Sequence, residues 1–313
     1  MSKKIYDTVI IGGGPAGLTA ALYAARGGLS VLLLERLSAG GQMAEAVQID
    51  NYPGFENGIN GFDLAEKMKA GAVRFGCEFR EGEVSGAELS GEIKKIYADG
   101  CEISARTVII AAGAEHKKLG LPDEERLIGK GVSYCASCDG AFYRGKDVAV
   151  VGGGNSAVSD ALLLSKFCRR VHLIHRRDTL RAEKIYESAL EKAGNIELHF
   201  NRSLTAISGA DRVSGAVISP TDGGKSEEIP CCGIFISIGR APLTEPFKNM
   251  TATDGSGYII APETTETGIP GVFAAGDVRT KPLRQIVTAA ADGATAAYLA
   301  QKYCSEQTKK DGD

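Results

Sequence analysis

The alternation of apolar and polar segments repeats the same order of elements twice along the chain. An apolar run at 8–11 precedes a glycine-rich turn, a helix-like segment rich in Ala and Leu, and a second apolar run at 30–34. The same order returns with apolar runs at 147–151 and 170–174. Strand, glycine-rich turn, helix and strand is the order of the βαβ unit that binds dinucleotides. The pattern therefore predicts two such units.

Glycines stand at both turns with the spacing that a bound dinucleotide requires. Glycine lets the backbone approach the pyrophosphate, and the following helix presents free N–H groups to the anion. One such motif is a weak signal, but two copies in full strand and helix context argue against ordinary tight turns. The first motif contains Gly12, Gly14, Pro15, Ala16 and Gly17, and the second contains Gly152, Gly154, Asn155, Ser156 and Ala157.

The end of the second strand in each unit indicates which nucleotide binds. The position 23 residues after the first glycine is Glu35 in the first unit and His175 in the second, where Arg176 and Arg177 follow and Arg181 lies four residues further. A carboxylate accepts hydrogen bonds from a ribose, whereas guanidinium groups pair with a 2′-phosphate. The first unit is therefore expected to bind FAD or NAD, and the second NADP(H).

Shorter strand patterns follow each unit and suggest β-meanders. They cover 79–86, 94–98 and 107–111 after the first unit, and 197–207, 212–219 and 233–238 after the second. A last apolar strand ends at Gly276 and Asp277, before an Ala-rich helix from about 285 to 301. Asp277 is placed either to hold a flavin ribityl hydroxyl or to cap this helix.

A Cys-Ala-Ser-Cys segment lies between the two units and predicts redox chemistry. Cys135 and Cys138 are separated by two residues, a spacing that allows cycling between dithiol and disulfide, and Asp139 follows directly. The alternative, half of a structural zinc site, needs two further ligands at close spacing. The histidines (His116, His172, His175, His199) are scattered along the chain, so no metal site is expected.

Composition narrows the class of protein. A net charge of −3 gives no basic surface for nucleic acid, and no apolar run approaches the roughly 20 residues of a membrane helix. The N-terminus reads as the start of a strand and not as a signal peptide, so a cytoplasmic protein is expected. The other six cysteines are then expected to be reduced, small buried residues: Cys77, Cys101, Cys168, Cys231, Cys232 and Cys304.

These motifs together resemble the low-molecular-weight, bacterial-type thioredoxin reductases, from about residue 6 to 302. The box at 135–140, Cys-Ala-Ser-Cys-Asp-Gly, between two dinucleotide motifs is the most specific part of the match. The remaining matches are the two glycine motifs, 40–42, 51–54, 175–178 with Arg181, 275–277 and 284–285.

The resemblance implies a fold of two Rossmann-like α/β domains, each three-layered with a β-meander. An NADPH domain at 116–243 would be inserted into an FAD domain formed by 1–115 and 244–313. The family forms homodimers. In the family pattern Cys138 touches the flavin, Cys135 attacks thioredoxin and Asp139 is the acid/base. FAD would be contacted by Gly41, Gln42, Asn51, Ala112, Gly276, Asp277, Arg284, Gln285 and Ile286.

Two departures from the family pattern stand out. Ala112 replaces the usual Thr and cannot supply its hydroxyl, and Cys231-Cys232 stands where an Asp is common. The intact arginine cluster favours NADPH over the ferredoxin used by some relatives. Other readings remain: a reductase of another redoxin or of a small disulfide, a flavin-bearing redox sensor, or an NADPH oxidase. Because Cys304 is the only late cysteine, no second pair can shuttle electrons, and the NADPH domain is expected to rotate between two poses.

Overall fold

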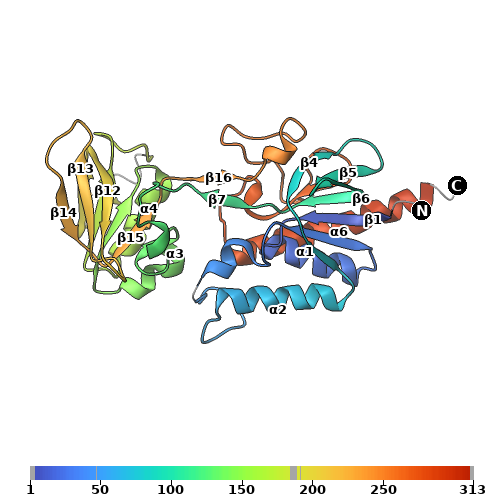
Figure 1. Ribbon diagram of the computed structural model, residues 1–313, viewed down its shortest axis with the longest axis horizontal. Helices are drawn as coiled ribbons and strands as arrows, with labels where there is room; N and C mark the ends of the chain where they lie inside the picture. Colours follow the sequence, from blue (N-terminus) through green and yellow to red (C-terminus); the bar gives the residue numbers. More distant parts are fainter. Residues whose placement is uncertain (1–3, 47, 184–188, 191, 311–313) are drawn as a thin grey trace. The chain divides into compact units, whose positions relative to one another are not determined.

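The chain divides into two units that are interleaved in sequence. The structure, a computed structural model, describes residues 4–46, 48–183, 189–190 and 192–310. Unit 1 consists of Met1–Glu115 and Ala241–Asp313, and unit 2 of His116–Arg240. Unit 2 is therefore one continuous stretch of chain, whereas unit 1 is completed only by the C-terminal segment (Figure 1).

Unit 1 is built on a seven-stranded sheet with the order β3-β2-β1-β6-β5-β4. The strands β1, β2, β3 and β6 run parallel, β17 adds a parallel partner to the end of β6, and β4 and β5 are antiparallel. The alternation of buried residues places one apolar face of the sheet against helices and the other against the meander. The strands are β1 Ile5–Ile11, β2 Val31–Glu35, β3 Glu78–Glu81, β4 Val84–Glu88, β5 Lys94–Ala98, β6 Cys101–Ile110 and β17 Val272–Ala274.

Two of the strand predictions for unit 1 are wrong in their bounds. The segment 79–86 is two strands, because β3 pairs parallel with β2 while β4 pairs antiparallel with β5. The strand predicted at 107–111 begins earlier, at Cys101, because β6 pairs first with β5 and then with β17 along the same strand.

The helices of unit 1 cover the dinucleotide face of its sheet. The small residues of α1 and α6 pack against each other, including Ala20, Ala24, Ala296 and Ala300. One helix, α2, is absent from the sequence predictions, although Asn60 caps it by accepting from the backbone N–H of Phe62. The helices are α1 Pro15–Arg26, α2 Gly61–Arg74 and α6 Ile286–Lys310, with 3₁₀ turns η1 Gly41–Glu45, η4 Glu245–Phe247 and η5 Gly276–Val278.

Unit 2 consists of a five-stranded parallel sheet between a helical layer and a three-stranded antiparallel sheet. The parallel order is β11-β10-β9-β15-β8, and the smaller sheet has the order β12-β13-β14. The strands are β8 Val132–Ser133, β9 Asp147–Val151, β10 Arg170–His175, β11 Ile196–Phe200, β12 Arg202–Ser208, β13 Gly215–Pro220, β14 Glu227–Pro230 and β15 Gly233–Ile236; the helices are α3 Ala136–Asp139 and α4 Asn155–Ser165, with 3₁₀ turns η2 Glu125–Leu127 and η3 Gly140–Tyr143.

The two units together confirm the predicted fold class, two Rossmann-like α/β domains. The segment predicted as one strand at 197–207 is again two strands, because β11 joins the parallel sheet and β12 the antiparallel one. β14 was not among the predicted strands.

The chain passes between the units through two strands that pair with each other. These are β7 Ala114–His116 and β16 Arg240–Pro242. Glycines flank the pair at Gly113, with φ 78°, and at Gly239, with φ 106°. Positive φ favours glycine at both positions, because a side chain is strained in this conformation.

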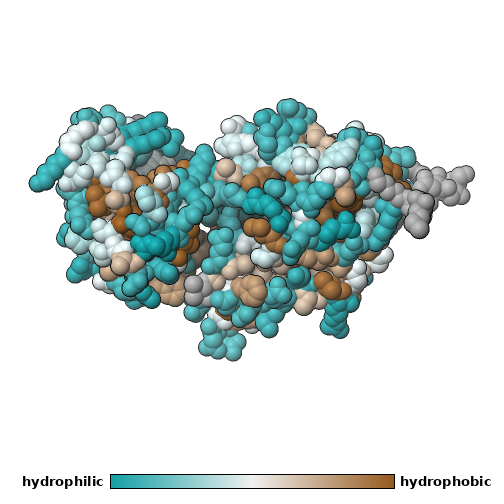
Figure 2. All heavy atoms as spheres, in the orientation of Figure 1, coloured by the Kyte–Doolittle hydropathy of each residue, from teal (hydrophilic) through white to brown (hydrophobic). Residues whose placement is uncertain are grey.

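Apolar surface is limited in the part of the chain that the structure describes. No helix there combines the length and hydropathy that a membrane span requires. On the face shown in Figure 2, hydrophobic residues form small separate areas among hydrophilic ones. One exposed aromatic residue, Phe142, follows the cysteine pair and is 49% exposed.

Candidate functional site

The first glycine turn is a tight junction of β1, β6 and α1. A Cβ atom at Gly12 would overlap the carbonyl oxygen of Ala111, and one at Gly17 would overlap the carbonyl oxygen of Gly12. Helix α1 then begins at Pro15 with no side-chain cap on its first turn. Its N-terminal N–H groups therefore remain available to an anion.

We expect Gly17→Ala to destabilise unit 1, because the added methyl group meets backbone and not a movable side chain. Overpacking of this kind costs about 1–3 kcal/mol of the free energy of unfolding. Gly71→Ala is the matched control, since the nearest atom to its Cβ is Leu22 Cδ1 at 4.0 Å and alanine favours the helix. Denaturant unfolding measures both variants; equal stability of the two would contradict the close approach described here.

Glu35 lies against the middle glycine of the first turn. Its Oε2 accepts a hydrogen bond from the backbone N–H of Gly13, and its Oε1 accepts from the N–H of Leu37 at 3.2 Å. The carboxylate at the end of β2 is thus fixed beside the phosphate-binding turn. In dinucleotide-binding βαβ units, an acidic residue about 20 residues after the glycine motif hydrogen-bonds the ribose.

Residues from three distant segments of unit 1 meet near the start of α6. Asn51 Nδ2 donates to Gln285 Oε1 at 3.0 Å, and Gln42 donates to the carbonyl oxygen of Ala114. Ile286 packs on the apolar cluster that contains Met43 and Ile49. Three other residues that were predicted to contact FAD also belong to unit 1. Gly41 is the first residue of η1, Ala112 lies beside Gly12, and the guanidinium group of Arg284 stacks on the ring of Tyr258.

A buried charge cluster supports the turn that carries Asp277. The carboxylate of Asp292 accepts from Arg279 Nε at 3.0 Å, from Lys281 Nζ at 2.7 Å and from the N–H of Gly276 at 2.9 Å. Burial alone would raise the pKa of Asp292, but the bonds from Arg279 and Lys281 hold it below its usual value. Sequence reasoning missed this cluster, although an acid in the Ala-rich start of α6 was a signal for it.

The position of Asp277 follows from this cluster. Asp277 lies in η5, directly after Gly276, which has φ 77°. A Cβ at Gly276 would lie 2.8 Å from Ala16 Cβ. Gly276, the residue before Asp277, therefore lies against Ala16, in the helix that follows the first glycine turn. That turn, η5 and the α6 start together form one continuous region of unit 1.

The second glycine turn has the same construction in unit 2. A Cβ at Gly152 would overlap the carbonyl oxygen of Ser237, and Gly154 caps α4 without a side-chain bond. His175, at the end of β10, lies against Gly153 as Glu35 lies against Gly13. Ala157 stands at the position of the third glycine, and Asn155 Nδ2 donates to Glu183 Oε1 at 2.9 Å.

The basic residues after β10 face solvent. Arg176, Arg177 and Arg181 are exposed, and no carboxylate in the described part of the chain pairs with them. The backbone N–H of Arg181 donates to the carbonyl oxygen of Gly153 at 2.6 Å, which ties this segment to the turn. His175 is buried, and burial lowers its pKa. Three exposed guanidinium groups beside a glycine turn are of the type that pairs with phosphate groups.

Cys135 and Cys138 form a disulfide, with 5.3 Å between their Cα atoms. Cys135 precedes the short helix α3, and its carbonyl oxygen accepts from the N–H of Asp139 at 3.1 Å. Cys138 is exposed and Cys135 half-buried. The pair lies at the end of β8, the edge strand of the sheet that carries the second glycine turn.

Asp139 is held beside the disulfide by a residue that sequence reasoning missed. Ser133 Oγ donates to Asp139 Oδ2 at 2.7 Å and accepts from the N–H of Cys135 at 3.1 Å. Burial raises the pKa of Asp139, while the bond from Ser133 opposes this shift. A carboxyl group with a raised pKa can hold a proton close to the sulfur atoms, as an acid/base requires.

The remaining cysteines do not all match the prediction. Four of them, Cys77, Cys168, Cys231 and Cys304, are buried as expected, but Cys101 and Cys232 are exposed. Cys101 is the first residue of β6, and Cys232 lies in the connection between β14 and β15. No disulfide joins Cys231 to Cys232.

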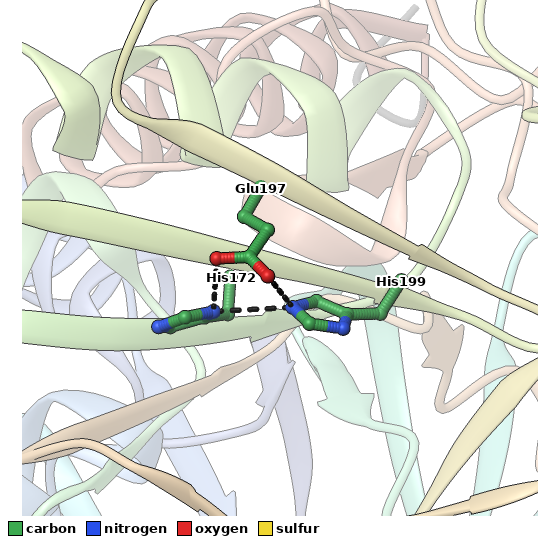
Figure 3. A group of neighbouring side chains, drawn as sticks. All are labelled: His172, Glu197 and His199. Carbon is green, nitrogen blue, oxygen red and sulfur yellow. Dashed lines mark hydrogen bonds and ion pairs between the residues drawn. The ribbon is translucent and has the colours of Figure 1, made fainter.

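Two of the histidines that are far apart in the sequence lie together in the structure. His172 on β10 and His199 on β11 lie together, and the carboxylate of Glu197 lies beside both rings (Figure 3). They are 27 residues apart in sequence, but the parallel pairing of β10 and β11 brings them together. Burial lowers the pKa of His172.

Comparison with known proteins bears on the whole chain. A family model described as pyridine nucleotide-disulphide oxidoreductase matches residues 6–293. The chain belongs to the pyridine nucleotide-disulphide oxidoreductase family. A thioredoxin reductase of Listeria monocytogenes is 46% identical over 305 residues, which cover 97% of this chain and 95% of that protein. One of Bacillus subtilis is also 46% identical, with 97% and 96% covered.

Solved structures of this oxidoreductase family agree with the same assignment. The thioredoxin reductase of Streptococcus pyogenes has a TM-score of 0.92 at 43% identity, covering 97% of this chain and 100% of that one. That of Lactococcus lactis, described as being in the FR conformation, has a TM-score of 0.67 at 44% identity, covering 96% and 99%. Membership in this family implies a flavin and a nicotinamide cofactor. The two glycine turns fit such groups, because each is followed by a helix whose first turn has no side-chain cap.

Proposed function

We propose that this chain is an NADPH-dependent, FAD-containing thioredoxin-disulfide reductase. The observation that carries the proposal is the Cys135–Cys138 disulfide in a unit that also holds a second dinucleotide turn. Relatives at 46% identity over nearly the whole chain are thioredoxin reductases, which supports the same activity. The proposal includes a homodimer, which the family pattern implies, and a cytoplasmic location, which is expected from the strand-like N-terminal segment.

The proposed assignment of the cofactors follows the two glycine turns. FAD would lie on the turn of unit 1, with its ribose at Glu35 and with Asp277 at the other end of the site. NADPH would lie on the turn of unit 2, with its 2′-phosphate at Arg176, Arg177 and Arg181. When bound, the two cofactors supply hydride transfer and pass two electrons on to the disulfide.

The chain's own residues complete the proposed reaction. Two electrons and two protons convert the Cys135–Cys138 disulfide into two thiols, and the Cys135 thiol then loses a proton. The Cys135 thiolate attacks a sulfur of the thioredoxin disulfide and forms a mixed disulfide. Cys138 then attacks Cys135, which restores the original bond and releases thioredoxin as a dithiol. Asp139, held by Ser133, would donate the proton that the leaving sulfur needs.

The activity is tested with the purified protein under anaerobic conditions. Each chain should consume two equivalents of NADPH, one to reduce the flavin and one to reduce the disulfide. Oxidised thioredoxin should then reoxidise the protein at catalytic rates. A redox sensor would be reoxidised slowly. An NADPH oxidase would need only oxygen, and a reductase of another disulfide would leave thioredoxin oxidised.

Replacing Arg176 and Arg177 with Ala should weaken the binding of NADPH while leaving the binding of NADH nearly unchanged. Each guanidinium group offers a charge-assisted bond worth about 1.5–3 kcal/mol, so the KM for NADPH should rise at least about tenfold. Arg212→Ala, which changes an exposed arginine elsewhere in unit 2, is the matched control. If the unmodified enzyme already prefers NADH, the proposed role of this cluster is wrong.

A further inference from the structure

Three metal-ligating side chains share one face of the parallel sheet in unit 2. The strand register pairs His172 with Glu197, and His199 follows two residues later on the same strand. Side chains two residues apart in a strand point to the same face. The neighbours Val171 and Leu173 pack into the apolar cluster that includes α4. The three side chains therefore point to the opposite face, where the smaller antiparallel sheet lies.

Their ligand atoms converge closely, as Figure 3 shows. His172 Nδ1 is 3.1 Å from His199 Nε2, and the carboxylate of Glu197 is 3.6 Å from each of these nitrogens. Ligands about 2.0–2.1 Å from a tetrahedral zinc ion are separated by about 3.3 Å. The observed separations lie on both sides of that value, so an ion fits between the three groups with little movement of the side chains.

The cluster is buried on the side of its two histidines and exposed on the side of its glutamate. The side chains of His172 and His199 are 7% and 14% exposed, whereas that of Glu197 is 50% exposed. An ion can enter past Glu197, and water can complete its coordination there. Arg170 Nη1, at 3.6 Å from Glu197 Oε2, is the cation that faces the carboxylate from the same strand as His172.

We propose that His172, Glu197 and His199 bind a divalent transition-metal ion of the zinc class. Two imidazole nitrogens and one carboxylate are the ligand types that this ion takes in three-ligand sites. Bound metal would join the edge strand β11 to β10, whose last residue, His175, pairs with Phe200 of β11. The site is distinct from the cysteine pair and does not depend on the proposed reductase activity.

The experiment titrates zinc into the full-length, flavin-loaded protein with Cys135–Cys138 oxidised, because a reduced dithiol would itself bind zinc. After treatment with a chelator, calorimetry with ZnCl₂ should show one ion bound per chain. His199→Gln and Glu197→Gln should each lower the affinity for zinc at least about tenfold. The matched control is Glu228→Gln, an exposed glutamate of β14 in the same unit, which should bind zinc as the unmodified protein does.

Anomalous diffraction from zinc-soaked crystals of the unmodified protein gives a second measurement that does not need the variants to fold. The expected peak lies between the His172 and His199 rings. Absence of zinc binding would overturn the proposal. So would unchanged affinity in His199→Gln, or a peak at the exposed thiols of Cys101 or Cys232 in place of the histidines.

Discussion

Cys135→Ser and Cys138→Ser should each lower thioredoxin reduction below detection. The structure joins these two sulfur atoms in one bond, and a single remaining thiol cannot carry two electrons to a disulfide and then close again. Turnover with NADPH and thioredoxin measures the loss. Cys232→Ser, which changes an exposed thiol of the same unit, should retain the full rate.

The two serine variants should differ in their absorption spectra. Cys135→Ser leaves Cys138, the thiol assigned to the flavin, and its thiolate should give a long-wavelength charge-transfer band. Cys138→Ser should give none. A band in Cys138→Ser alone would reverse the two roles. Activity in both variants would mean that other cysteines carry the chemistry.

Holding the two units in a single arrangement should lower the turnover rate at least about 100-fold. The disulfide and the second glycine turn both belong to unit 2, yet both must exchange electrons with a flavin proposed for unit 1. Cys304 offers no shuttle, because it is buried and burial raises the pKa of its thiol. Rotation of unit 2 at the β7 and β16 crossings would let each group reach the flavin in turn. Domain motions of this kind occur in microseconds to milliseconds, which is compatible with ordinary turnover.

The test places one new cysteine on each unit after the exposed Cys101 and Cys232 have been changed to Ser. A bifunctional reagent with a cleavable spacer then links the units. One half-reaction should stop, either flavin reduction by NADPH or disulfide reduction by the flavin, and cleavage should restore it. The same reagent bridging two cysteines within unit 2 is the control. Normal turnover by the linked protein would exclude rotation.

The parts of the fold that were predicted correctly depend on local sequence. Glycine turns need residues at fixed spacing, so both βαβ units and the bounds of β9 followed directly from the chain. The Cys135–Cys138 pairing is equally local. Helix α2 was missed although Asn60 is a good cap, because its apolar face is narrow and centred on Leu64 and Ala65.

The residues that were missed depend on contacts between distant segments. The register of β10 against β11 decides that His172 meets Glu197, and no spacing in the sequence encodes that register. Ser133 binds Asp139 only because the chain turns after β8. Sequence reasoning therefore found the groups that carry the proposed chemistry, but not the groups that hold them in place.

The insertion of unit 2 into unit 1 has a consequence for synthesis on the ribosome. When Arg240 has been added, unit 2 has its whole sequence, but unit 1 still lacks β17 and α6. The small-residue face of α1 packs on α6, so it stays uncovered until roughly 70 further residues are made. At about 5–20 residues per second this takes about 4–14 s. During that interval the N-terminal segment is exposed to aggregation and to chaperones, while the later segment can already be folded.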